Sequence, residues 1–238
     1  QALAREIADV LAAARKPLIV SGTGAMSTAV IAAAANIAAA LKKRDAAVEI
    51  SLAVPEVNSI GVSMMGAGVL DEAFARVDRG EADAVVVLEN DLYRRADRGQ
   101  VAALFRDAKA VIVVDHQMTA TAEQAHLLLP AASVFESDGT FISMEGRAQR
   151  HYQVFEATYY NKDIGTREAW RWLSELNNKP WQILDDVIAS CVASLPQLAR
   201  ITDAAPNAKF RVDGMKLARE PHRYSGRTAM RANLSVHE

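Results

Sequence analysis

The feature that most constrains the fold is the alternation of short, continuously apolar segments with longer helical patterns. Three such segments, rich in valine, isoleucine, leucine or alanine, cover residues 18–20, 84–88 and 111–114, and 47–52 is a further strand candidate. Strands without a polar face are expected where both faces of a sheet are covered. Their alternation with helices is typical of βαβ units. The sequence therefore predicts an α/β fold with a mostly parallel sheet.

The helices expected between these strands follow from the spacing of the apolar residues. They are predicted over 2–15, from Ser27 or Thr28 onward, over 71–79 and 96–108, and in a short piece over 120–125. A short strand is predicted over 126–129 and a loop over 58–68. Because right-handed crossovers place helices on both faces of such a sheet, residues 1–150 are interpreted as one Rossmann-like three-layer domain.

The composition changes after residue 150. Seven aromatic residues fall within about thirty positions, although the chain is only 6% aromatic: Tyr152, Phe155, Tyr159, Tyr160, Trp170, Trp172 and Trp181. Helices are predicted over 166–176 and 181–191, so 151–205 is interpreted as a smaller helical, loop-rich extension that packs on the sheet domain or on a neighbour. Residues 206–238 lack periodicity and are expected to wrap a neighbouring domain or subunit, with disorder as the alternative.

Charge and cysteine content argue against several functions. The net charge is −2, with 27 basic and 29 acidic residues interspersed, which is not a nucleic-acid-binding pattern. The single cysteine, Cys191, cannot form an internal disulfide or ligate an iron–sulfur cluster alone, and is interpreted as a small buried hydrophobe. The five histidines are scattered, so no metal site is expected.

No direct membrane insertion is expected either. The most membrane-like segment, 28–41, is shorter than the roughly 20 residues of a spanning helix. The chain begins with Gln1, inside a helical pattern, and we expect it to be an internal piece of a longer polypeptide. The absence of a targeting sequence therefore says nothing about location.

A candidate phosphate-binding turn follows the first predicted strand. Gly22-Thr23-Gly24 lies between a strand and a helix, where a glycine-rich loop can hold a phosphate at the helix N-terminus. The third glycine of G-x-G-x-x-G falls on Ser27, so the match consists of two glycines only. A tight turn without a ligand explains the same residues and is the favoured alternative.

A second candidate lies where the strand 111–114 ends. Asp115 would stand at the carboxyl edge of the sheet, the place where doubly wound folds bind ligands. Thr119 and Thr121 could donate to phosphate oxygens or cap the short helix that follows, and capping is favoured. Together with the turn at 22–24, Asp115 and Thr119 are the predicted cofactor-binding residues.

The densest charged set comes next in the chain and consists of Glu136, Asp138, Glu145 and Arg147. As structure, Asp138-Gly139-Thr140 would be a turn, and Glu145 and Arg147 an ion pair that holds a loop. As chemistry, the set could be an acid/base pair beside an anion-binding arginine. Because no nucleophile or metal-ligand set accompanies it, the structural interpretation is favoured and no catalytic residue is predicted.

The order of motifs from VIVVD at 111–115, through LLLP at 127–130, to GTF at 139–141 and EGRAQ at 145–149 resembles the molybdopterin oxidoreductase superfamily. The resemblance implies a strand edge that faces a guanosine phosphate arm of the molybdenum cofactor. Around Asn90 that family commonly has glycine and proline, where this chain has Glu89 and Asp91; Ser143 and His126 are further departures. Added negative charge is unfavourable beside an anionic nucleotide, so the cleft is expected to be vestigial.

The segment REPHRYSGRTAMRANLSVHE at 219–238 resembles the family of large peripheral-arm subunits, the G subunits, of bacterial respiratory NADH:quinone oxidoreductase (complex I). The resemblance implies a parent complex that relays electrons from NADH through FMN and iron–sulfur clusters to quinone. The 2Fe-2S and 4Fe-4S clusters of such a subunit would be bound by cysteines N-terminal to this chain, which would itself hold no cofactor. It would serve as a scaffold in the peripheral arm, at the cytoplasmic face of the bacterial inner membrane.

The same resemblance implies contacts with the flavin-bearing and iron–sulfur subunits and with the remaining domains of the parent polypeptide. Arginine and tyrosine are enriched in desolvated interfaces, and the tail carries a group of such residues. The interface candidates are Arg219, His222, Arg223, Tyr224, Arg227 and Arg231. A solvated surface loop is the alternative interpretation of this group.

Two other functions remain open. The chain could be the nucleotide-arm-binding domain of a true molybdopterin enzyme of the formate dehydrogenase type, which the departures at Glu89, Asp91 and Ser143 disfavour. It could also be a non-enzymatic nucleotide-sensing module, a function that only the glycine turn at 22–24 supports.

Overall fold

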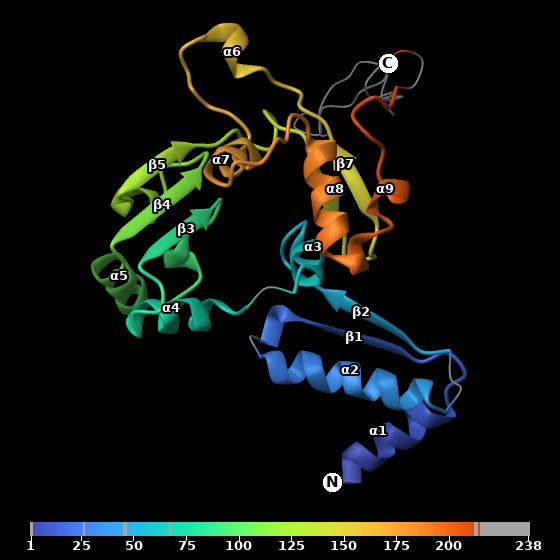
Figure 1. Ribbon diagram of the computed structural model, residues 1–238. Helices are drawn as coiled ribbons and strands as arrows, with labels where there is room; N and C mark the ends of the chain where they lie inside the picture. The colour runs from blue at the N-terminus through green and yellow to red at the C-terminus, as the bar shows by residue number, and fades with distance from the viewer. Residues whose placement is uncertain (1, 26, 45–46, 67, 212–213, 215–238) are drawn as a thin grey trace, which may run out of the picture.

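The computed structural model of the chain describes residues 2–25, 27–44, 47–66, 68–211 and 214. Among these residues the strands form three small sheets, ordered β1-β2, β3-β4-β5 and β6-β7. The first two sheets are parallel and the third is antiparallel. The predicted α/β fold with mostly parallel strands is confirmed, and the parallel strands are divided between two sheets rather than joined in one (Figure 1).

The first parallel sheet belongs to the N-terminal part of the chain. Its elements are α1 (Ala2–Ala13), β1 (Leu18–Gly22), a 3-10 turn (Thr23–Ala25), α2 (Thr28–Lys42) and β2 (Glu49–Ala53). The alanine-rich α2 packs along the two strands, since small side chains allow a helix to approach a sheet closely (Figure 1). In the part of α1 that the structure describes, no residue is buried, and Leu3 and Val10 are exposed.

The second parallel sheet contains the main hydrophobic core. Its strands are β3 (Ala84–Leu88), β4 (Ala110–Asp115) and β5 (Leu127–Pro130), and the helices beside them are α4 (Leu70–Asp78) and α5 (Arg98–Asp107). The short helix α3 (Ser59–Met64) packs instead against the hairpin described below. Val101, Val111 and Val113 are fully buried. Both α4 and α5 contribute to this core, which explains why β3 and β4 are continuously apolar.

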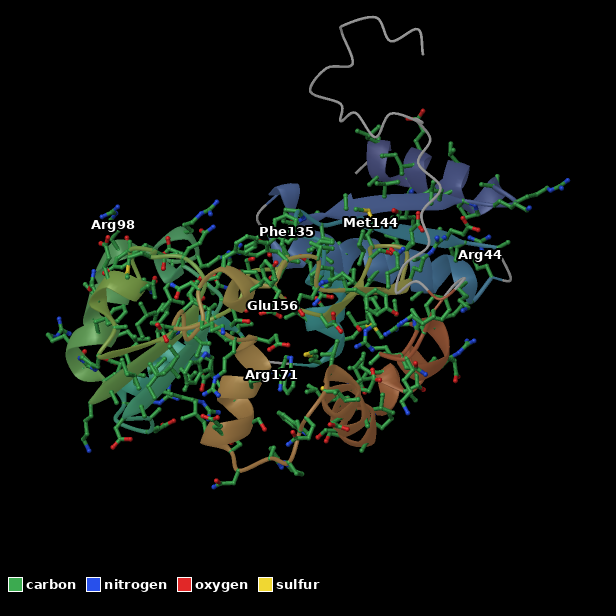
Figure 2. The ribbon with its side chains drawn as sticks, turned by 90° about the horizontal axis from the view of Figure 1, so that it is seen from above. Arg44, Arg98, Phe135, Met144, Glu156 and Arg171 are labelled. Carbon is green, nitrogen blue, oxygen red and sulfur yellow. The ribbon has the colours of Figure 1, made fainter. Side chains whose placement is uncertain are left out.

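The two parallel sheets lie in different parts of the molecule. Seen from above, Arg44, which follows α2, and Arg98, which opens α5, stand at opposite ends, and Arg171 lies between them (Figure 2). Arg95 bridges from the second part to Glu56, with 2.5 Å between the guanidinium and the carboxylate. The sequence pattern located the five parallel strands but did not specify which of them pair.

The loop predicted over 58–68 contains the helix α3, so that prediction was wrong. A helix of six residues has little stability of its own, and contacts with distant segments hold it. The amide of Ile142 donates to Asn58 Oδ1 at 2.9 Å before the helix begins. At its other end, Gln197 Nε2 donates to the carbonyl of Met64 at 2.6 Å.

The antiparallel hairpin consists of β6 (Gly139–Ile142) and β7 (Ala148–His151). Asp138-Gly139-Thr140 was predicted to be a turn; instead Gly139 and Thr140 begin β6, and the tight turn lies further on, with Gly146 at φ 75°. The elements that follow are α6 (Ala157–Tyr160), α7 (Ala169–Leu176), α8 (Leu184–Ser194), a 3-10 turn (Pro196–Leu198) and α9 (Ile201–Ala204). The hairpin packs against this last group, because Ile142 and Ala148 share a buried cluster with Leu198 and Ala205 (Figure 1).

A buried arginine fastens the hairpin to the helices. The Arg150 side chain is only 1% exposed and lies 3.1 Å from Asp138, and it also pairs with Asp185 at the start of α8. Asp185 in turn accepts from the amide of Ala208 at 2.9 Å. One guanidinium thus joins three segments of the chain.

Within the ranges that the structure describes, no helix is both long and apolar enough to cross a membrane.

Candidate functional site

Two carboxylates stand where β3 and β4 end side by side. Leu88 pairs with Val114, so Glu89 and Asp115 follow at the same sheet edge, and the Glu89 amide donates to the Val114 carbonyl at 2.8 Å. Asp115 is 6% exposed; its Oδ1 accepts from the Gln117 amide at 3.0 Å. Asp115 therefore lies at the carboxyl edge, as predicted.

The two threonines after Asp115 are already bonded within the protein. Thr119 Oγ1 accepts from the Ala122 amide at 3.1 Å and so caps the following turn. That turn is a single 3-10 turn over Ala122–Gln124, shorter than the helix predicted over 120–125. Thr121 is fully buried; its hydroxyl accepts from the Leu92 amide at 2.8 Å and donates to Asp91 Oδ1 at 2.7 Å. Both hydroxyls serve the fold.

Glu89 has an unusual backbone and an unusual carboxyl group. Its φ is +46°, in the left-handed region that glycine favours. Desolvation raises the pKa of its carboxyl group, Asp115 raises it further, and His116 opposes the shift. The edge is therefore an unfavourable place for additional negative charge.

These residues line a pocket of about 140 Å³, here called the edge pocket. Its lining residues are Glu89, Asn90, Asp91, Arg94, Arg95, Asp115, His116, Gln117 and Thr119. Arg95 is engaged, with its Nε donating to Asn90 Oδ1 at 3.1 Å and its other end paired with Glu56. The pocket thus contains three carboxylates, and one of its two arginines is already bonded to neighbours.

The turn at 22–24 ends a strand of the other parallel sheet. A Cβ added to Gly22 would lie 2.1 Å from the carbonyl oxygen of Ala53, so glycine is needed there for β1 and β2 to approach. A Cβ on Gly24 would meet nothing within 4 Å among the described residues. The structure therefore places the two predicted halves of the cofactor cleft, Gly22-Thr23-Gly24 and Asp115 with Thr119, on different sheets.

A larger cleft of about 290 Å³ lies between the hairpin and the start of α7, and we call it the hairpin cleft. It is lined by Glu89, His116, Ala132, Val134, Ser137, Asp138, Gly139, Thr140, Phe141, His151, Glu168, Ala169 and Trp170. These positions span more than eighty residues of sequence, and the alternation that marks β6 and β7 is only four residues long in each strand. Sequence reasoning therefore missed this cleft.

The charged set at 136–147 does not converge on a reaction centre. Glu136 accepts from the Ser133 amide at 2.9 Å, and Asp138 belongs to the Arg150 ion pair. Glu145 and Arg147 form an ion pair at 3.5 Å, and their side chains are 72% and 68% exposed, respectively. The predicted ion pair between Glu145 and Arg147 is therefore present, whereas the predicted turn at 138–140 is the start of β6.

Metal and thiol chemistry find little support in the described part of the chain. No group of three or more histidine, cysteine, aspartate or glutamate side chains there could hold a metal ion. Cys191 is half-buried and packs against the cluster that joins the hairpin to α8. Burial raises the pKa of its thiol, which lowers its reactivity.

Comparison with known proteins identifies the fold. Residues 1–179 match the family model described as molybdopterin oxidoreductase. The chain belongs to the molybdopterin oxidoreductase family. The G subunit of NADH-quinone oxidoreductase from Pseudomonas putida is 56% identical over 244 residues, which cover 100% of this chain and 27% of that relative. The protein of the same name from Escherichia coli K12 is 56% identical over 238 residues, covering 98% of the chain and 26% of the relative. The chain therefore spans about a quarter of the length of the curated relatives it matches.

Membership of the molybdopterin oxidoreductase family implies a phosphate-bearing molybdenum cofactor, and the edge pocket does not fit one. Glu89 places a side chain at a left-handed position where glycine would let a ligand approach the backbone. The carboxylates of Asp91 and Asp115 would repel phosphates, and the Thr121 hydroxyl already donates its proton to Asp91.

The interface candidates of this molybdopterin oxidoreductase homologue, from Arg219 to Arg231, lie outside the described residues. The division of the chain at residues 150 and 205 remains a prediction.

Proposed function

We propose that this chain is part of the large peripheral-arm subunit, the G subunit, of a bacterial NADH:quinone oxidoreductase, and that it serves there as a structural scaffold. The observation that carries the proposal is 56% identity, over the whole chain, to relatives that bear this name. The parent complex would pass electrons from NADH through FMN and iron–sulfur clusters to quinone.

The scaffold role is supported by how the polar side chains are used. The residues that sequence analysis assigned to a cofactor are mostly engaged in the fold: Thr119 caps a turn, and Gly22 permits close strand pairing. The chain contains one cysteine, whereas iron–sulfur clusters take about four. The 2Fe-2S and 4Fe-4S clusters of the parent polypeptide would therefore be bound by cysteines elsewhere in it.

The proposal also gives the chain a location and partners. As part of the peripheral arm it would stand at the cytoplasmic face of the inner membrane, in contact with the flavin-bearing and iron–sulfur subunits. The tail residues Arg219, His222, Arg223, Tyr224, Arg227 and Arg231 remain the proposed contacts. Many large apolar side chains are exposed in the described residues, among them Val154, Tyr159 and Tyr160 at 75–79%, and such surfaces mark protein contacts.

Isolation from native membranes tests the assignment. An affinity tag on the protein should recover flavin together with NADH-dependent quinone reduction in one particle. Recovery of the tagged protein without flavin and without that activity would contradict the assignment.

A titration with guanosine diphosphate tests the loss of the cofactor. The scaffold role predicts a dissociation constant weaker than about 1 mM, or roughly 4 kcal/mol of binding at most. A constant tighter than about 10 μM, roughly 7 kcal/mol, would favour the alternative, a nucleotide-arm-binding domain of a molybdopterin enzyme of the formate dehydrogenase type.

A further inference from the structure

A group of exposed, mostly aromatic side chains, here called the aromatic patch, lies on and beside the loop that carries α6, which stands away from the three sheets in Figure 1. Its members are 43–79% exposed: Phe135, Val154, Phe155, Tyr159 and Tyr160. The amides of Val154 and Phe155 both donate to the Phe135 carbonyl, at 2.9 and 3.0 Å. Tyr160 stacks on Phe155 with ring centroids 5.5 Å apart, and Tyr159 meets Tyr160 edge-on at 5.1 Å. These contacts make the patch one continuous surface, of the kind that another segment covers.

The rings of the patch lack a cationic partner that other rings of the chain have. An arginine lies over four rings elsewhere, with its guanidinium carbon 3.6–5.7 Å from the ring centroid: Tyr93, Tyr152, Trp170 and Trp172. Within the described part of the chain, no arginine or lysine lies over a ring of the patch. Guanidinium groups stack flat on aromatic faces and are attracted by them. The patch therefore suits a segment that presents arginines.

The charge on the loop also favours a cation. Residues 153–166 include two carboxyl groups, Glu156 and Asp163, and one lysine, Lys162. The Thr158 hydroxyl donates to the Glu156 carboxylate at 2.5 Å and lowers the pKa of that carboxyl group, which is therefore ionised at pH 7. An approaching guanidinium group consequently meets both a π face and a fixed negative charge.

A segment with this chemistry belongs to the same chain. Residues 215–238, here called the arginine tail, contain two acidic residues and five basic ones: Lys216, Arg219, Arg223, Arg227 and Arg231. The whole chain has a net charge of −2, so the arginine tail is opposite in charge to the rest. Its four arginines recur at every fourth position, which provides several guanidinium groups along one short stretch.

The described residues that lead to the arginine tail lie beside the root of the patch. The hydroxyl of Tyr152, two residues before Val154, donates to the Asn207 carbonyl at 3.2 Å. Arg150 Nη1 donates to the Pro206 carbonyl at 3.4 Å. An extended segment of 24 residues spans roughly 80 Å, so the patch is within reach. Because a tethered segment acts at an effective concentration in the millimolar range, weak individual contacts are sufficient to hold it.

We propose that the arginine tail folds back on its own chain and covers the aromatic patch, with guanidinium groups stacked on the rings of Tyr159 and Tyr160. The proposal rests on the interface role that the proposed function gives to the tail, and it names the partner as a surface of the same polypeptide. It does not depend on the electron-transfer assignment.

Hydroxyl-radical footprinting of the purified chain tests the contact, because the radical is uncharged and reports how far each side chain is exposed. The test variant combines four substitutions: Arg219→Gln, Arg223→Gln, Arg227→Gln and Arg231→Gln. Oxidation of Tyr159 and Tyr160, read by mass spectrometry, should rise about three- to tenfold, as expected for the loss of two exposed arginine–ring contacts. Oxidation of Tyr93, which has its own arginine, should not change.

A matched control removes four positive charges from the N-terminal part of the chain. It combines Arg5→Gln, Arg15→Gln, Lys42→Gln and Lys43→Gln. The net charge falls by the same amount as in the test variant, and oxidation of Tyr159 and Tyr160 should remain at the wild-type level.

The reciprocal measurement changes the patch and observes the tail. Tyr159→Ala combined with Tyr160→Ala should accelerate hydrogen exchange of residues 219–231 about threefold or more, because the docked segment is released. Val57→Ala, at a side chain that is 67% exposed in another part of the molecule, should leave that exchange unchanged.

Three results would overturn the proposal. Equal oxidation of Tyr159 and Tyr160 in wild type and in the four-arginine variant would show that the tail does not cover them. Protection that disappears on dilution would assign the patch to a second copy of the chain. Protection found only in the particle from native membranes would assign it to another subunit, and would leave the NADH:quinone oxidoreductase assignment standing. Protection in the purified chain, in turn, would stand even if the tagged protein were recovered without flavin.

Discussion

Replacing Arg150 by methionine should destabilise the part of the molecule that contains the hairpin. The guanidinium is 1% exposed and pairs with Asp138 and Asp185, whose side chains are 21% and 29% exposed. Methionine fills a similar volume but leaves two carboxylates without their cation. Breaking a fully buried ion pair costs about 3–5 kcal/mol. Because both carboxylates keep some solvent contact, we expect about 2–4 kcal/mol here.

The assay is urea unfolding at pH 7 followed by tryptophan fluorescence, combined with hydrogen exchange of residues 139–151. Exchange in the hairpin should accelerate in Arg150→Met, because its link to α8 is lost. Arg147→Met, in the turn of the same hairpin, is the matched control. Its ion pair with Glu145 is about 70% exposed, so a change of at most a few tenths of a kcal/mol is expected. Equal midpoints and equal exchange in the two variants would refute the reasoning.

Three further outcomes follow from individual contacts. Gly22→Ala should lower the melting temperature markedly in a thermal scan, because its Cβ would lie 2.1 Å from the Ala53 oxygen, whereas Gly24→Ala should not. Thr121→Val should reduce the free energy of unfolding in urea by about 1–3 kcal/mol, since it removes a fully buried hydroxyl with two bonds. Glu89→Gln should be more stable than wild type at pH 7, because a raised carboxyl pKa in the fold means that stability is lost as pH rises above about 4.5. Solvent screening limits that gain to about 1 kcal/mol, and unfolding at pH 4 and below should show no difference between the two proteins.

The secondary structure that sequence reasoning found is the part that is set by local pattern. β3 was predicted with its observed bounds, because an uninterrupted valine run has few alternatives. The helix α3 and the hairpin were missed, since both are short and depend on contacts such as that of Asn58 with Ile142. The division of the parallel strands into two sheets could not be predicted either, because the composition of a strand does not identify the strand it pairs with.

Of the candidate sites, too, those set by local sequence were predicted and those formed by the tertiary fold were not. The position of Asp115 followed from a rule about strand ends, and the structure confirms that position. The structure shows Thr119 in the capping role that was favoured, while the role of its hydroxyl as a phosphate donor stays a prediction. The hairpin cleft could not be found from sequence, because Glu89 and Trp170 approach each other only through the tertiary fold.

The most direct test of the scaffold role is elemental and pterin analysis of the full-length protein purified from its native membranes. The account predicts iron, from clusters elsewhere in the parent polypeptide, without molybdenum and without pterin. Stoichiometric molybdenum and pterin would contradict it, and would make Asp115, Thr119 and the Gly22–Gly24 turn candidates for the cofactor site.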